Sequence, residues 1–165
     1  MCSSRSLRYL HRIGADEGDT VIIRKEYIIS MEDCVFCKII SGAIPCMKIY
    51  EDEYTLAFLD IARDVDGHIL VIPKVHVTSI YDCDTDTLHH LMDTVKKVSV
   101  HCIHSCGYEG VNLLNASGIS AGQSVPHFHI HLIPRKADDS IDAWPQFHGG
   151  EKSLEEMFDK LKMEF

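Results

Sequence analysis

The chain has 165 residues, 45% of them hydrophobic and 25% charged, so it is long enough for one domain with a substantial core. Its formal net charge of -9 argues against a nucleic-acid-binding surface, because such surfaces neutralise many phosphates with Lys and Arg. A mononucleotide site is compatible with this charge. Since no apolar run approaches the ~20 residues of a membrane-spanning helix, we expect a soluble protein without a membrane partner.

The first 30 residues differ in composition from the rest of the chain. Residues 1–12 carry Arg and Ser but no acidic residue, and they lack the apolar segment of a secretory signal. A transit peptide and a simple extension both fit this pattern. We favour an N-terminal extension of unknown role over residues 1–30 and one compact domain over residues 31–165. Seven cysteines, an odd number at irregular spacing, favour a reducing compartment, so we expect a cytoplasmic protein.

The predicted elements follow closely after Met31. We expect a short helix over 32–40 that ends at Ser41 and Gly42, because Gly tolerates the left-handed conformation at a helix C-terminus. Patterns typical of strands cover 47–51, 54–60 and 68–73. The first two form a hairpin around Asp52 and Glu53, and the third follows a turn signal that begins at Asp64 and ends at Gly67.

A long helix is predicted from Asp84 or Thr85, either of which can cap it, to Cys106 and Gly107. Apolar residues at helical spacing predict its buried face: Leu88, Leu91, Met92, Val95, Val98 and Cys102. Four histidines lie largely off this face, and we expect them at the surface: His89, His90, His101 and His104.

The remaining segments complete an α+β domain with an antiparallel sheet. A strand is expected over 110–115 and a loop of small residues over 116–122, before the segment that contains three histidines. Ser153 and Glu156 form a capping box for a C-terminal helix. Mostly sequential strands around one long helix predict this fold class.

Three histidines at a spacing of two stand between Ser124 and Pro134. His127, His129 and His131 alternate with apolar residues, which is typical of a half-buried strand inside the sheet. The apolar residues would point to the core: Phe128, Ile130 and Leu132. Three imidazoles on one face predict a reactive surface, because imidazole serves as nucleophile, proton carrier or metal ligand near pH 7.

The loop before these histidines, residues 117–124, is rich in Gly and Ser. Backbone N–H groups in such a loop can approach an anion closely, and Gln123 and Ser124 add neutral donors for phosphate oxygens. A plain connector between strands explains the same composition. Beside three histidines, the loop favours phosphoryl-transfer chemistry.

Three blocks of the chain resemble the histidine-triad (HIT) superfamily of nucleotide hydrolases and transferases. They are Cys34-x-x-Cys37-Lys38-Ile39-Ile40-x-Gly42-x-Ile44-Pro45, Gly67-His68-x-Leu70-Val71-Ile72-Pro73-Lys74-x-His76, and Gly122-Gln123-Ser124-Val125-x-His127-x-His129-x-His131. The resemblance covers about residues 31–136. It implies an antiparallel sheet of about five strands, one long and one or two short helices, and a homodimer with the long helix and a strand at the interface.

Residue by residue, the resemblance implies that His129 attacks the α-phosphorus and forms a nucleotidyl-imidazole intermediate. His131 is similar to the ring that contacts the phosphate, and His68 to the outer ring that buttresses the triad. Ser124 and Gln123 resemble donors to the leaving group and bridging oxygen. Asp60 resembles the ribose-hydroxyl acceptor and Asn115 a residue that holds phosphate or leaving group. The implied nucleotide-binding set is Asp60, Asn115, Gly122, Gln123 and Ser124, and the implied catalytic set is His68, Ser124, His127, His129 and His131.

The two cysteines of the first block allow redox, zinc-binding or purely structural roles when considered alone. Some members of the superfamily bind structural zinc through residues that match Cys34, Cys37, His76 and His127 here. This Cys2His2 set suits tetrahedral zinc, so we expect structural zinc and no organic cofactor. His127 is then divided between closing the zinc site and orienting His129.

The implied function is hydrolysis or transfer at the α-phosphate of a purine nucleotide, with release of nucleoside monophosphate. The Gly122–Val125 block is closer to the phosphoramidase branch, and the segment 133–136 resembles the dinucleoside-polyphosphate branch, so the substrate stays open. One alternative is a nucleotide-binding regulatory protein with little or no catalysis. Another is a metal-storage or redox role for Cys34 and Cys37.

Overall fold

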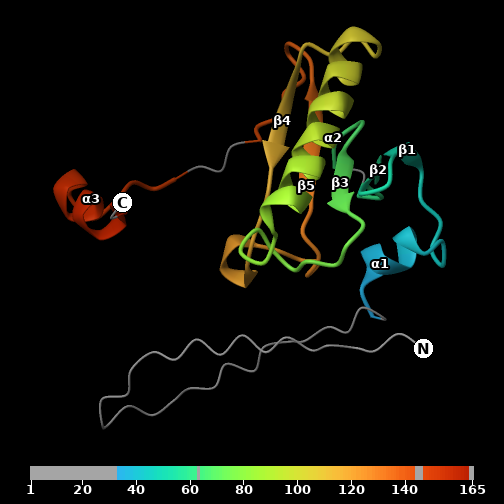
Figure 1. Ribbon diagram of the computed structural model, residues 1–165. Helices are drawn as coiled ribbons and strands as arrows, with labels where there is room; N and C mark the ends of the chain where they lie inside the picture. The colour runs from blue at the N-terminus through green and yellow to red at the C-terminus, as the bar shows by residue number, and fades with distance from the viewer. Residues whose placement is uncertain (1–32, 63, 144–146, 164–165) are drawn as a thin grey trace, which may run out of the picture.

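The protein forms one five-stranded antiparallel sheet with a long helix against it (Figure 1). This computed structural model describes residues 33–62, 64–143 and 147–163, so the predicted extension over 1–30 lies outside the described residues. The strands are β1 (Lys48–Glu51), β2 (Thr55–Leu59), β3 (Ile69–Pro73), β4 (Gly110–Leu114) and β5 (Ile130–Arg135). Their order is β1-β2-β3-β5-β4, which confirms the predicted α+β class and places β5 inside the sheet.

The described residues contain three α-helices, one long and two short, as predicted. They are α1 (Val35–Ile40), α2 (Thr85–His104) and α3 (Leu154–Leu161), and a short 3₁₀ helix, η1 (Ile119–Ala121), lies in the small-residue loop. Asp84 caps α2 by accepting a hydrogen bond from the Thr87 backbone N–H, and Ser153 and Glu156 form the predicted capping box of α3. Among the described helices, none is both long and apolar enough to cross a membrane.

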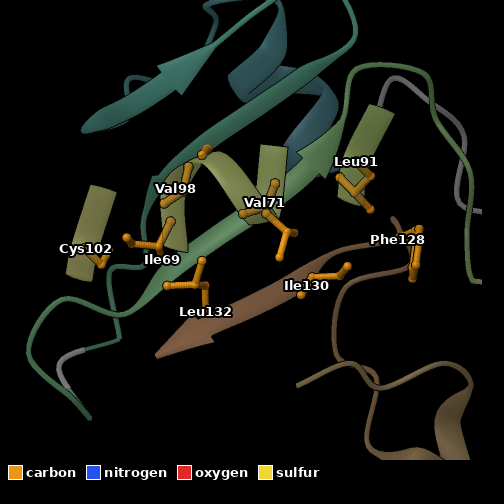
Figure 2. Packing of buried hydrophobic residues seen from close by; sticks show 10 residues of the cluster. Ile69, Val71, Leu91, Val98, Cys102, Phe128, Ile130 and Leu132 are labelled. Atoms are coloured by element: carbon orange, nitrogen blue, oxygen red, sulfur yellow. The ribbon is translucent and has the colours of Figure 1, made fainter. Parts of the chain in front are cut away.

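One face of the sheet packs against α2, as Figure 2 shows. The buried helix residues Leu91, Val95, Val98 and Cys102 meet apolar side chains of the sheet and of the segment before β5: Ala57, Ile69, Val71, Phe128, Ile130 and Leu132. Met92 was predicted in this buried face but is 43% exposed, because it lies at the edge of the stripe and turns outward. The sequence pattern did not identify Thr94, which is buried because its hydroxyl pairs with that of Thr55 at 2.7 Å.

The opposite face of the sheet is covered by α1 and the residue before it. Cys34 and Phe36 form a second buried cluster there with side chains from β2 and β3: Leu56, Phe58, Leu70 and Ile72. β2 and β3 are therefore buried on both faces, which explains their nearly continuous apolar sequences. The three histidines belong to this second face.

The prediction that all three histidines lie on one strand was wrong in its extent. β5 begins at Ile130, so only His131 is on it, while His127 and His129 precede it. This earlier segment is held differently, since the Phe128 N–H donates to the Val77 carbonyl at 2.7 Å outside any strand ladder. The alternation is nevertheless kept, because Phe128 and Ile130 belong to the cluster beneath α2 and the histidines do not.

The α2 face yields a stability prediction. Leu91 is 0% exposed, so Leu91→Ala should lower the free energy of unfolding by about 2–5 kcal/mol through lost burial and a cavity. Lys96→Ala, on the exposed side of the same helix, should change it by less than about 0.5 kcal/mol. Urea unfolding followed by circular dichroism measures both, and equal losses in the two variants would contradict this packing.

Candidate functional site

The site forms where three segments meet on the α1 side of the sheet. They are the connection from β2 to β3, the chain that leaves β3 at Pro73, and the segment 127–131 that enters β5. Antiparallel pairing aligns Leu70 with His131, so the start of β3 and β5 lie side by side. Phe36 of α1 packs edge-on against two of the three histidine rings, with its ring centroid 5.7 Å from that of His127 and 5.3 Å from that of His129.

His127 is fully buried, and its ring has a fixed direction. Its Nε2 lies 2.9 Å from the Pro73 carbonyl oxygen, which can only accept, so Nε2 carries the proton. Burial lowers the pKa of His127 to about 4, and the ring is therefore neutral near pH 7. Its Nδ1 is then an unprotonated nitrogen, 3.5 Å from the Sγ of Cys34 and 3.6 Å from the Sγ of Cys37.

His76 completes a cluster of four potential metal ligands with these residues. The ligand atoms of Cys34, Cys37, His76 and His127 all lie within 4.8 Å of one another, and the Cys37 Sγ is 3.2 Å from the His76 Nδ1. In a tetrahedral zinc site, sulfur and nitrogen ligands are about 3.5 Å apart, so these spacings fit. Burial and the neighbouring Cys34 raise the pKa of Cys37 to about 11, and metal binding would release that proton.

His129 is held by the backbone of His127. Its Nδ1 lies 2.6 Å from the His127 carbonyl oxygen, so Nδ1 is the protonated nitrogen and Nε2 keeps its lone pair. The side chain is 3% exposed, and burial lowers its pKa below the ordinary value, which favours the neutral ring. From the other side, the Asn115 amide N–H donates to the carbonyl of His129 at 2.8 Å. A neutral imidazole fixed in this way can act as a nucleophile or a general base.

His131 and His68 form a direct pair beside His129. The His68 Nε2 lies 2.8 Å from the His131 Nδ1, and the ring centroids of His129 and His131 are 4.8 Å apart. Burial is the largest cause that lowers the pKa of His131 to about 4, and the nearby His129 and His68 lower it further. Two carboxylates face the outer nitrogen of His68: Asp64 at 3.0 Å and Asp60 at 3.8 Å.

The small-residue loop is closed by its own side chains. The Gly118 N–H donates to the Gln123 Oε1 at 2.7 Å, and the Gln123 amide N–H donates to the Thr78 carbonyl at 2.7 Å. Gly122 has φ +86°, a left-handed conformation that favours glycine, and a Cβ there would meet open space. Ser124 is exposed on this loop.

The structure therefore brings together most of the residues predicted for the site. Asp60, His68, His129 and His131 form one contiguous group, while His127 belongs to the metal-ligand cluster behind it. Asn115 contacts the backbone of His129, and its Oδ1 accepts a hydrogen bond from Ser117, so both ends of its amide are engaged within the chain.

Three contributors to this region were not assigned from the sequence. Phe36 looked like an ordinary helix residue. The Pro73 group in contact with His127 is a backbone carbonyl, which no residue type reveals. Asp64 was interpreted only as part of a turn. Its spacing of four residues before His68 is a signal that could have identified the contact.

A family model described as the HIT domain matches residues 41–138. The Bacillus subtilis protein named Protein hit is 46% identical over 115 residues, covering 68% of this chain and 79% of that protein. The adenosine 5'-monophosphoramidase of Schizosaccharomyces pombe is 41% identical over 106 residues, covering 64% of this chain and 77% of that protein.

Solved structures agree with the sequence relatives. A HIT family protein from Bacillus anthracis superposes with a TM-score of 0.69 at 43% identity, covering 78% of this chain and 92% of that one. A zinc-bound histidine triad family protein from Mycobacterium smegmatis has a TM-score of 0.64 at 34% identity, covering 69% of this chain and 83% of that one. The fold is therefore shared along most of their length.

Proposed function

Because the chain belongs to the HIT domain family, we propose that it is a hydrolase or transferase acting on the α-phosphate of purine nucleotides. The substrates are nucleoside phosphoramidates or dinucleoside polyphosphates, and the product is a nucleoside monophosphate. The reaction proceeds through a nucleotidyl intermediate on His129.

The observation that carries this proposal is the 2.6 Å hydrogen bond from the His129 Nδ1 to the His127 carbonyl. It fixes which nitrogen holds the proton, so the unprotonated Nε2 is available to attack without a prior proton transfer. The lowered pKa of His129 keeps this nitrogen free near pH 7.

The chemistry needs two displacements at phosphorus. First, the lone pair of His129 Nε2 forms a bond to the α-phosphorus, and the bond to the leaving amine or phosphate breaks, with its electron pair going to the leaving group, which takes a proton from solvent. Water then attacks the same phosphorus, the P–N bond to His129 breaks, and the water proton passes to solvent or a neighbouring base. Nucleoside monophosphate is released and the imidazole returns to its starting state.

The other residues of the site bind and orient the nucleotide. His131, 4.8 Å from His129 between ring centroids, contacts a phosphoryl oxygen, and His68 supports it through their 2.8 Å contact. The loop that contains Gly122, Gln123 and Ser124 lies beside the leaving group. Asp60 accepts hydrogen bonds from the ribose hydroxyls. Asn115 acts through the backbone of His129, because its amide is already engaged there.

A phosphoramidate is the substrate to test first. The Schizosaccharomyces pombe relative is named an adenosine 5'-monophosphoramidase and aligns over 64% of this chain. A nucleotide-binding protein without turnover is the alternative, and the neutral, correctly oriented His129 favours the enzyme over it.

We also propose that structural zinc binds Cys34, Cys37, His76 and His127. The spacing of the four ligand atoms supports this, as does the hydrogen bond that leaves the His127 Nδ1 unprotonated. The metal would supply a crosslink between α1 and the segment before β5. His127 then serves the nucleophile through its backbone carbonyl rather than through its ring.

A homodimer is the third part of the proposal. β4 is the last strand of the sheet, and among the described strands it pairs only with β5, so its outer edge has backbone groups free to pair. Leu113 on β4 is 44% exposed, and Met92 and Val100 on α2 are exposed as well. These features suit an interface formed by β4 and α2.

Three further statements stay predictions from the sequence. They are the cytoplasmic location, the absence of an organic cofactor and nucleic-acid partner, and the division of the chain into an extension over 1–30 and a domain over 31–165.

Turnover is tested with adenosine phosphoramidate and diadenosine polyphosphates, with trapping of nucleotidylated protein by mass spectrometry. His129→Ala should remove the adduct and lower kcat by more than about 1,000-fold, because the nucleophile is lost, while nucleotide binding is retained. His101→Ala, at an exposed position on α2, is the matched control and should behave like the wild type. An adduct that survives in His129→Ala contradicts the mechanism, and wild-type protein without turnover on these substrates supports the binding protein instead.

Metal analysis of the purified protein should find about one zinc ion per chain, bound by the four proposed ligands. Cys37→Ser should lose most of this zinc and unfold at a lower temperature, because the metal stabilises only the folded state. Cys106→Ser replaces an exposed thiol and should keep both the zinc and the stability. Zinc retained by Cys37→Ser at the wild-type level would refute the site.

Light scattering coupled to size-exclusion chromatography should give twice the mass of the chain. Leu113→Asp places a charge on the proposed β4 interface and should shift the protein toward monomer. Ile119→Asp, at the 90% exposed Ile119 of η1, provides the control and should remain dimeric. A monomeric wild type would disprove the dimer.

A further inference from the structure

Asp64 makes a contact that connects it to the site through two histidines. Its Oδ1 lies 3.0 Å from the His68 Nδ1, and the His68 Nε2 lies 2.8 Å from the His131 Nδ1. Since a carboxylate only accepts, His68 donates its Nδ1–H to Asp64. A continuous chain of hydrogen bonds therefore runs from an exposed carboxylate to the ring beside the nucleophile.

The position of one proton decides what His131 can do. When His68 is neutral, its Nε2 accepts from the His131 Nδ1–H, and the His131 Nε2 is only an acceptor. When His68 carries a second proton, its Nε2–H donates to the His131 Nδ1, and the His131 Nε2–H becomes a donor. A phosphoryl oxygen needs the second arrangement, because it carries negative charge and accepts hydrogen bonds.

We propose that Asp64 is a positioning residue that holds this proton on His68 and so makes His131 a hydrogen-bond donor to the phosphoryl oxygens. The inference rests on the proposed function and deepens it. Asp64 does not touch the substrate; it acts through His68 and His131.

The charges around the pair favour the proton on His68 rather than on His131. Asp64 and Asp60 face His68 from the β2–β3 connection. The same two carboxylates also act on His131, but burial and the neighbouring His129 and His68 outweigh them there. Burial lowers the pKa of His131 to about 4, so this ring stays neutral near pH 7. The hydrogen bond from His68 is also the main reason why the pKa of Asp64 is lowered.

A purely structural role in the turn is the competing explanation. The Asp64 Oδ1 also accepts a hydrogen bond from the Val65 N–H at 2.9 Å, which shapes the loop. Asp64→Asn separates the two roles, because the amide oxygen can still accept both hydrogen bonds while the charge is removed. Asp66→Asn removes the same charge from an exposed residue whose contacts in the described structure do not include His68.

The test measures the proton itself and its effect on turnover. NMR follows the imidazole C–H signals of His68 and His131 against pH in the free protein. Asp64→Asn should lower the titration midpoint of His68 by about 0.5–1 pH unit, because an opposite charge favours the protonated ring and Asp64 is partly screened by solvent. With adenosine phosphoramidate as substrate, the pH at which kcat/KM falls on the alkaline side should be lower by the same amount. Above both midpoints kcat/KM should then be about 3- to 10-fold lower, with little change below them.

Asp66→Asn should move neither the midpoint nor the pH at which kcat/KM falls. The proposal is overturned if Asp64→Asn leaves the His68 midpoint unchanged, if Asp66→Asn shifts it equally, or if kcat/KM falls by the same factor at every pH. Should wild-type protein show no turnover, the proposed function and the catalytic use of this proton both fail. The NMR midpoints would still show whether Asp64 controls His68.

Discussion

The hydrogen bond between the His129 Nδ1 and the His127 carbonyl is the interaction on which the site depends. It joins two residues that are neighbours on the same extended segment, so the triad spacing itself supplies the partner of the nucleophile. His127 can perform two tasks because they use different atoms. Its carbonyl orients His129, while its ring, fixed by the Pro73 carbonyl, faces the two cysteines. His127 thus serves the candidate site with its carbonyl and the potential metal centre with its ring.

The sheet explains how this arrangement stays in place. β5 lies between β3 and β4, and Phe128, Ile130 and Leu132 anchor its entry segment in the core beneath α2. The alternation that buries these side chains turns the histidines to the other face, where Phe36 of α1 contacts His127 and His129. Burial on that face keeps His127, His129 and His131 neutral and places His68 at the boundary between buried imidazoles and two carboxylates. The negative charge beside these rings comes from Asp60 and Asp64 on the β2–β3 connection.

Much of this could be predicted from residue patterns. The spacing of the histidines gave the shared face, and the helical stripe gave the core side of α2, because both depend on local periodicity. The extent of β5 and the exposure of Met92 could not be predicted, since they depend on which backbone groups pair and how far the helix rotates against the sheet. The Pro73 carbonyl and Phe36 meet the triad only through long-range folding. Asp64 looked like a turn residue because a turn and a carboxylate–imidazole contact use the same residue types.

Nitrogen NMR of imidazole-labelled protein tests the central claim most directly, because it identifies the protonated nitrogen of His129 in the free protein. At neutral pH we expect a neutral ring with the proton on Nδ1 and an unprotonated Nε2. A ring that carries its proton on Nε2, or on both nitrogens, would contradict it.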